Sequence, residues 1–130
     1  MKSVTEEQLR GLAEKFIAGV RDDLGVELAY DEASVEWADG YVGRVRASVS
    51  EDAVGWISNL IGSFLGECVI ANYGGRWRET EDGVGVCFDG DNCAFPFAKV
   101  QKHFLHGEGD SILGFYKTIG VVFKDFINAH

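Results

Sequence analysis

The sequence predicts one α+β domain over residues 1–130, with three helices, a three-stranded antiparallel meander and two further helices, the helices being packed on one sheet face. Two observations lead to this prediction. Apolar residues recur at helical spacing as far as about residue 73, and they then alternate with polar residues as far as Pro96. A chain of 130 residues that is 46% hydrophobic can also bury about two thirds of its unfolded surface in one core.

Capping residues and glycines place the first two helices. Thr5 begins a sequence with the spacing of a capping box, so the first helix is predicted to start directly after it. Gly25 suits the end of that helix. Asp31 or Ser34 can cap the second helix, because both side chains accept hydrogen bonds from the amides of a first helical turn.

The third helix, predicted over about 52–73, is expected to be the central element. Its large apolar residues gather on one broad face, which suits a core of side chains. Three glycines gather on the opposite face, where another part of the backbone can approach closely: Gly55, Gly62 and Gly66. The length and low charge of this stretch raise the question of a membrane span, but its glycines and polar residues favour a helix buried in a soluble fold.

Three strands are predicted after the third helix, at 76–80, 84–88 and 93–97, with hairpin turns between them. Alternation assigns the apolar face to Trp77, Val84, Val86, Phe88 and Phe95, and the outward face to Arg76, Arg78, Gly85, Cys87 and Ala94. Pro96 ends the third strand and can open a helix over 97–106. Asp110 and Ser111 are expected to cap the last helix.

Composition excludes several classes of function. The net charge of −9 repels phosphate backbones and anionic membranes, so neither nucleic acid nor a membrane is expected as a partner. The amino terminus lacks the apolar core of a signal peptide. The three cysteines form no paired framework, so we expect free thiols and a cytoplasmic protein.

Glu67 is the single charge between Asp52 and Arg76. A carboxylate in the most apolar element must be neutralised, paired or used in chemistry. The structural interpretation is a carboxylate that pairs with Arg76, Arg78 or Arg44, or that accepts hydrogen bonds from the chain around the glycine pair at 74–75. Arg76 or Arg78 is the favoured charged partner because that glycine pair folds the chain back. The functional interpretation is a ligand site or general base formed with the same two arginines.

Other chemical signals are weaker. His103 and His106 lie three residues apart on one predicted helix, which allows a shared metal, but no further ligands converge on them and no metal or other cofactor is predicted. Strand alternation sends Cys87 outward and Cys93 inward, which argues against a disulfide unless a bulge shifts the register. No nucleophile elbow or phosphate-binding loop is present in the sequence.

The layout of several short motifs resembles a family of small bacterial domains of unknown function. The motifs are Leu65-Gly66-Glu67, Gly74-Gly75-Arg76-Trp77, Phe95-Pro96-Phe97 with Lys99-Val100, and Gly107 with Asp110-Ser111. The resemblance covers roughly residues 5–120. It implies a bacterial cytoplasmic protein, supplies no established activity, and leaves open an immunity protein for an antibacterial toxin.

An acidic rim is predicted where the second strand turn meets the end of the fourth helix. If that helix runs back along the sheet, it gathers Asp89, Asp91, Glu108 and Asp110. The leading hypothesis is therefore a non-enzymatic module that binds a basic protein partner, with toxin neutralisation as one such role. The alternative is a small enzyme or ligand-binding protein with a pocket near Glu67, Arg76 and Arg78.

Overall fold

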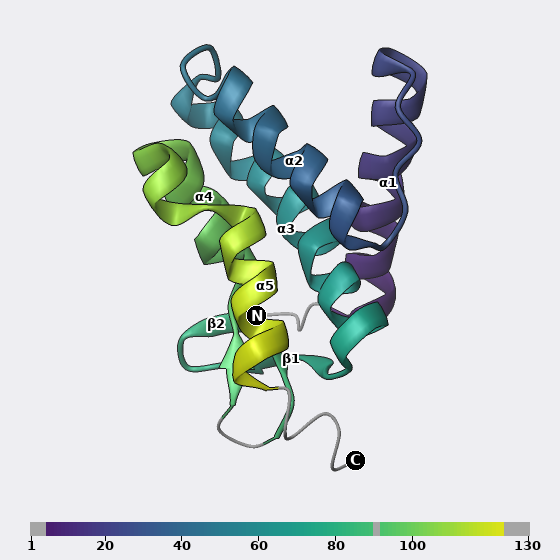
Figure 1. The fold of residues 1–130 in the computed structure, drawn as a ribbon, viewed down its shortest axis with the longest axis vertical. Helices are drawn as coiled ribbons and strands as arrows, with labels where there is room; N and C mark the ends of the chain where they lie inside the picture. The colour runs from purple at the N-terminus through teal and green to yellow at the C-terminus, as the bar shows by residue number, and fades with distance from the viewer. Residues whose placement is uncertain (1–4, 90–91, 124–130) are drawn as a thin grey trace.

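The computed structural model describes residues 5–89 and 92–123, with Glu108 and Asp110 described by their backbone alone (Figure 1). In chain order the elements are α1 (Glu6–Leu24), α2 (Glu32–Val45), α3 (Glu51–Tyr73), β1 (Arg76–Thr80), β2 (Gly83–Cys87), β3 (Cys93–Ala94), α4 (Pro96–His106), the short 3-10 helix η1 (Gly107–Asp110) and α5 (Ile112–Val122). This order confirms the predicted α+β fold.

The helix ends form as capping chemistry predicts. Thr5 and Gln8 make the reciprocal hydrogen bonds of a capping box, and Gly25 ends α1 with a left-handed φ of 69°. Asp31 rather than Ser34 caps α2, and its carboxylate accepts a hydrogen bond from the Ser34 amide. Ser111 caps α5 by accepting from the amide of Gly114.

Helix α3 is the central element, as predicted. It passes through the middle of the molecule, with α1 on one side and α4 on the other (Figure 1). Every residue from 61 to 69 is buried. Within the described residues, α3 is the one helix long and apolar enough to cross a bilayer, and 56% of its apolar window is covered by the rest of the fold.

The glycine face of α3 receives aromatic side chains. A Cβ at Gly66 would overlap the indole ring of Trp77, and a Cβ at Gly62 would lie 3.1 Å from the Cα of Phe97. The expected close approach is therefore confirmed at these two glycines, chiefly by rings rather than by backbone. Gly55 differs, because it is exposed and a Cβ there would meet nothing within 4 Å.

The sheet is antiparallel in the order β1-β2-β3. Trp77 pairs with Val86 on the buried face, and Arg76 and Arg78 are exposed, as predicted. The predicted phase of the third strand is wrong, because Ala94 pairs with Val86 and is buried.

The outward assignment of Gly85 and Cys87 is also wrong, since both are buried. Phe95, which was assigned to the apolar face, covers the opposite face at Gly85, where a Cβ would lie 2.9 Å from the Phe95 ring. The physical reason is the length of β3. Strand β3 has only two residues, and its register pairs Ala94 with Val86, so Ala94 takes the apolar face and alternation turns Phe95 to the opposite one.

Cys87 and Cys93 form a disulfide, contrary to the expectation of free thiols. They are direct partners across β2 and β3, with Cα atoms 4.0 Å apart, so their side chains point to the same face. Cys68 is a buried free thiol, and burial raises its pKa, which keeps it protonated. Because disulfides persist in oxidising compartments, this bond removes the thiol-based reason for expecting a cytoplasmic protein.

Candidate functional site

Glu67 lies in a closed cluster between three elements. Its Oε2 accepts a hydrogen bond from Trp77 Nε1 at 2.7 Å, and its Oε1 lies 3.5 Å from Nε of Arg10 on α1. The predicted burial of Glu67 is confirmed, at 8% exposure. The predicted partners are wrong, because β1 turns Trp77 toward α3 and therefore turns the neighbouring Arg76 and Arg78 away.

The predicted ligand site of Glu67, Arg76 and Arg78 is therefore not brought together in one pocket. Arg76 donates to Glu6 on α1 at 3.1 Å, and Arg78 is exposed on the outer face of β1. Tyr30, in the connection between α1 and α2, packs against Phe64 of α3 with ring centroids 5.9 Å apart. Burial raises the pKa of Tyr30, with smaller contributions from the negative charges of Glu14 and Glu67. This arrangement ties α1, α3 and β1 together.

His103 belongs to a second polar cluster. Its Nδ1 lies 3.4 Å from Asp39 Oδ1, and the same oxygen accepts from the Ile112 amide at 2.7 Å and from the Ser111 hydroxyl at 3.2 Å. His103 is 1% exposed whereas His106 is exposed, so the two imidazoles face different surroundings. Across residues 5–89 and 92–123, no group of three or more potential metal ligands occurs.

The acidic rim predicted from Asp89, Asp91, Glu108 and Asp110 is not formed by the part that is described. Asp89 is exposed and accepts from the amide and side chain of Asn92, at 3.0 and 2.7 Å; Asp91 lies outside the described residues. Glu108 and Asp110 belong to η1, at the start of α5, whereas Phe123 at the other end of α5 stacks on Phe88.

The turn near Asp89 and the helix η1 therefore lie near opposite ends of α5, whose 11 residues span about 16 Å. The physical reason is the course of α4. It packs along α3 and leads away from the sheet, instead of running back along it as the rim required.

A different acidic surface extends from the last turn of α1 through the connection into α2. Residues 22–36 contain six acidic side chains and no basic one. All six are exposed: Asp22, Asp23, Glu27, Asp31, Glu32 and Glu36. Sequence reasoning missed this surface, although the uninterrupted run of one charge sign was visible in the sequence.

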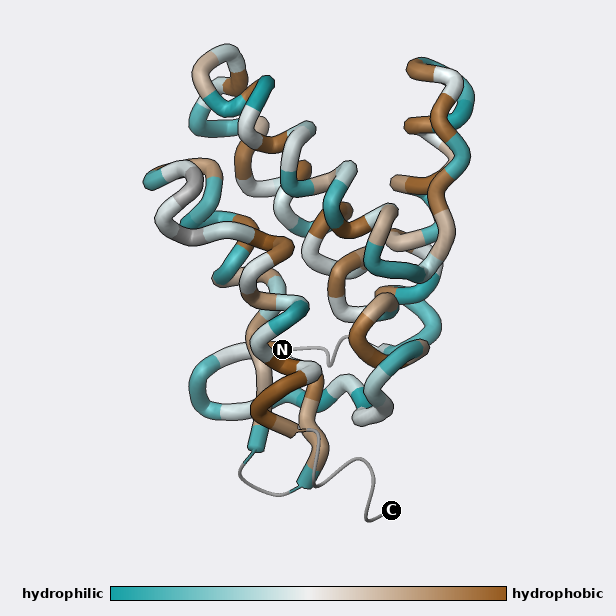
Figure 2. The backbone as a smooth tube through the Cα atoms, viewed as in Figure 1, coloured by the Kyte–Doolittle hydropathy of each residue, from teal (hydrophilic) through white to brown (hydrophobic). Residues whose placement is uncertain are grey.

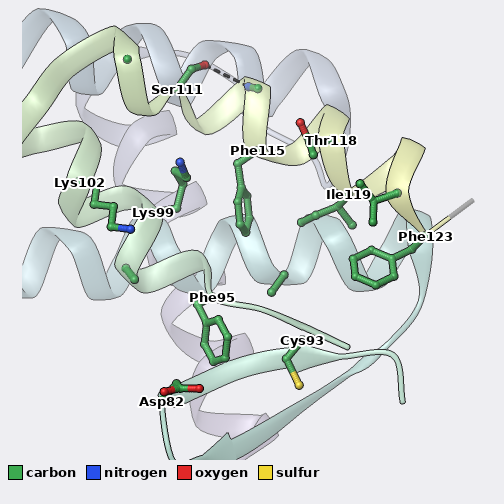
Figure 3. A pocket seen from close by; sticks show the side chains of 15 residues that line it. Asp82, Cys93, Phe95, Lys99, Lys102, Ser111, Phe115, Thr118, Ile119 and Phe123 are labelled. Carbon is green, nitrogen blue, oxygen red and sulfur yellow. Dashed lines mark hydrogen bonds between the residues drawn. The ribbon is translucent and has the colours of Figure 1, made fainter. Parts of the chain in front are cut away.

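An apolar groove lies between α4, α5 and the end of β3 (Figure 3). Its volume is about 790 Å³. Phe95 directly after β3, Lys102 of α4 and Phe115 of α5 point toward it (Figure 3). No single sequence motif marks this groove, because its lining comes from segments that only the fold brings together.

Comparison with known proteins found no matching family model, no matching curated protein and no matching solved structure. The acidic segment 22–36 and the groove are surfaces of the described residues on which a partner or ligand could bind.

Proposed function

We propose that this protein is a non-enzymatic interaction module that holds a basic protein partner against residues 22–36. The observation that carries the proposal is the run of six exposed acidic side chains without a single basic one. Such a patch attracts a positively charged surface and accelerates association. A toxin that is neutralised by this protein is one partner of that kind.

The position of Asp22 and Asp23 supports a role in binding. Both lie in the last turn of α1, where the backbone carbonyls already give the helix end a partial negative charge. Each acidic side chain at such an end costs about 0.3–1 kcal/mol at low ionic strength. Arg21 offsets this in part through its 3.2 Å contact with Asp22. A binding role accounts for two carboxylates where folding alone favours cations.

The alternative of a small enzyme with a pocket at Glu67 has less support. Catalytic carboxylates need access to a substrate. Glu67 is instead held by Trp77 and Arg10, and the Trp77 ring fills the space beside Gly66. This geometry suits a structural carboxylate that satisfies a buried indole N–H.

Charge-matched variants test the proposal. The first carries Asp22→Asn, Asp23→Asn, Glu27→Gln and Glu36→Gln, which leaves the caps of α2 and its first turn intact. The control removes four exposed carboxylates outside residues 22–36, with the substitutions Glu7→Gln, Glu51→Gln, Asp52→Asn and Glu81→Gln. Both variants lose four negative charges, so any difference between their association rates reports where on the surface the charges lie.

The measurement is the association rate with lysozyme, a folded protein of high positive charge, at low and high salt. We expect the first variant to associate about tenfold more slowly than the parent at low salt, and the control to change by less than about threefold. High salt should remove the difference by screening. Equal slowing of both variants would show that net charge alone acts, and it would overturn the assignment of the surface.

A further inference from the structure

A second pocket lies between α1, α3, α4 and the turn that joins β1 to β2. Its volume is about 410 Å³, which falls within the range of about 300–1,000 Å³ that small-molecule sites occupy. Most of its lining is apolar and comes from segments far apart in the sequence: Leu9, Leu12, Val84, Phe95, Phe97 and Ala98. The size and the lining suit a ring or a short hydrocarbon chain.

The apolar lining is held in place by the core. The Phe97 ring packs against that of Trp77 with centroids 5.5 Å apart, and it fills the space that Gly62 leaves open on α3. Figure 2 shows the hydrophobic residues of α1 on the side of the helix that faces α3, and Leu9 is 3% exposed. The lining is therefore preformed, so little side-chain entropy is lost when a ligand binds.

Asp82 supplies the charge of the pocket. Among the described residues that line it, Asp82 is the one ionisable side chain. None of the ion pairs between described residues uses the Asp82 carboxylate, and the hydrogen bond of this residue is made by its backbone amide, to Thr80. A pocket that is apolar apart from one carboxylate is complementary to an apolar cation.

The lysines of the groove beside α5 lie apart from this carboxylate. The pocket and the groove share Asp82, Phe95 and Ala98 as lining residues. Lys99 and Lys102 line only the groove, and Figure 3 shows both of them on the far side of Phe95 from Asp82. Neither lysine therefore occupies the position that a bound cation would take at Asp82.

Two further features favour an ammonium group over a neutral head. The faces of the Phe95 and Phe97 rings carry partial negative charge, which attracts a cation. Asn59 and Gln101 line the pocket from exposed positions, and their amide oxygens can accept hydrogen bonds from an N–H donor. The uncharged part of the lining therefore supports the same ligand charge as Asp82.

We propose that this pocket binds a small organic amine in its protonated form, with the ammonium group at Asp82 and an apolar body against Leu12 and Phe97. The carboxylate selects the cation, and the apolar lining retains the body. The site is separate from residues 22–36, so its test can fail while the proposed interaction surface stands.

NMR titration of the isotope-labelled protein with 3-phenylpropylamine tests the proposal, with 3-phenylpropanol as the neutral analogue. We expect the amine to bind about fivefold more tightly than the alcohol, which is the strength of an exposed ion pair. n-Butylamine, which carries the charge without the ring, should bind at least about tenfold more weakly than 3-phenylpropylamine. The backbone amide resonances of Val84, Ala98 and Gln101 should shift on binding.

Three outcomes of this titration would overturn the proposal. The first is the absence of saturable binding. The second is equal affinity for the amine and the alcohol, which would remove the role of Asp82. The third is equal affinity for the two amines, which would show that charge alone attracts the ligand to this acidic protein.

Two carboxylate variants test the position of the ammonium group. Asp82→Asn should lower the affinity for the amine about fivefold, to that of the alcohol, and should leave the affinity for the alcohol unchanged. Glu81→Gln is the matched control, since Glu81 is the exposed neighbour of Asp82 and is absent from the described lining. It should change the affinity for the amine by less than about twofold. Equal losses in both variants would overturn the assignment to Asp82.

Two blocking variants separate the pocket from the groove beside α5. Asn59→Trp, at an exposed position that lines only the pocket, should prevent binding of both the amine and the alcohol. Gly114→Trp, at an exposed position that lines only the groove, should leave binding unchanged. Thermal unfolding without ligand verifies that each variant keeps the fold, and the shifted resonances of the parent protein locate the ligand independently. Binding that Gly114→Trp prevents and Asn59→Trp does not would place the amine in the groove and overturn the assignment.

Discussion

Two glycines on the central and last helices show how differently the two sides of this fold are filled. At Gly66 on α3, the space where a Cβ would lie is occupied by the ring of Trp77. At Gly114 on α5, a Cβ would meet only Ser111, at 3.5 Å, and beyond it the groove is open. The first glycine is a packing requirement, whereas the second leaves room for a ligand. The face of α3 that packs on Trp77, which we call the closed side, therefore determines stability. Residues 22–36 and the groove beside α5, which we call the open sides, carry the candidate binding surfaces.

The largest effect is expected from removing the ring that closes the α3 side. Trp77→Ala should lower the free energy of unfolding by about 3–5 kcal/mol, because Trp77 is 6% exposed and packs over Gly66 and against Phe97. Denaturant unfolding measures this change. Trp56→Ala is the matched control, since Trp56 is 60% exposed and its loss should change stability by less than about 0.5 kcal/mol. Similar losses in both variants would contradict the packing of Trp77.

A direct comparison of the two glycines gives the next effect. Gly66→Ala should cost about 1–3 kcal/mol, because the new methyl group overlaps the Trp77 ring and forces a shift of packed side chains. Gly114→Ala should instead stabilise the protein by up to about 1 kcal/mol, since alanine favours a helix over glycine. Chemical denaturation of the two single variants measures the contrast. A stabilising Gly66→Ala would show that the α3 side is not tightly closed.

Substitutions of Glu67 separate hydrogen bonding from charge on the closed side. Glu67→Leu should cost about 1–3 kcal/mol because it leaves the buried N–H of Trp77 without an acceptor. Glu67→Gln should cost less, since the amide oxygen can still accept that hydrogen bond. Arg10→Ala is expected to cost less than about 1 kcal/mol, because the Arg10 side chain is 60% exposed. Equal tolerance of Gln and Leu in unfolding experiments would show that the buried carboxylate is incidental.

The closed side was largely predictable from the sequence, because local signals agree there. The capping box at Thr5, the stop at Gly25 and the apolar periodicity of 52–73 each specify the same helices that form. The burial of Glu67 and Trp77 followed from the absence of other charges and from strand alternation. Glu67 was paired with the wrong arginines because the relevant one, Arg10, is 57 residues away and is brought near by helix packing.

The open sides were much less predictable, because they depend on the register of a short strand and on the direction in which α4 packs. A strand of only two residues carries too little alternation to fix its phase, so the register that joins Cys87 to Cys93 was missed. The course of α4 along α3, rather than along the sheet, separates η1 from the Asp89 turn. The groove has no linear motif, since β3, α4 and α5 each supply only part of its lining.

The most gradual effect is expected in alkali, where the closed side must keep two buried groups neutral. Burial raises the pKa of Cys68 above its ordinary value of 9.0 and that of Tyr116 above 10.0, and a hydrogen bond with Tyr73 adds to the shift at Tyr116. The unfolded chain releases these protons near the ordinary values, so above about pH 9 the native state binds more protons than the unfolded state.

The free energy of unfolding should therefore be unaffected by these groups below pH 9 and should fall above it, by at most about 1.4 kcal/mol per pH unit for each group. Urea unfolding between pH 8 and pH 11 measures the slope. Tyr116→Phe should reduce the slope above pH 10, because the phenylalanine ring keeps the packing beside Tyr73 but releases no proton. An unchanged slope in that variant would show that Tyr116 ionises as readily in the folded protein as in the unfolded chain, and that this end of α5 is as open as the groove.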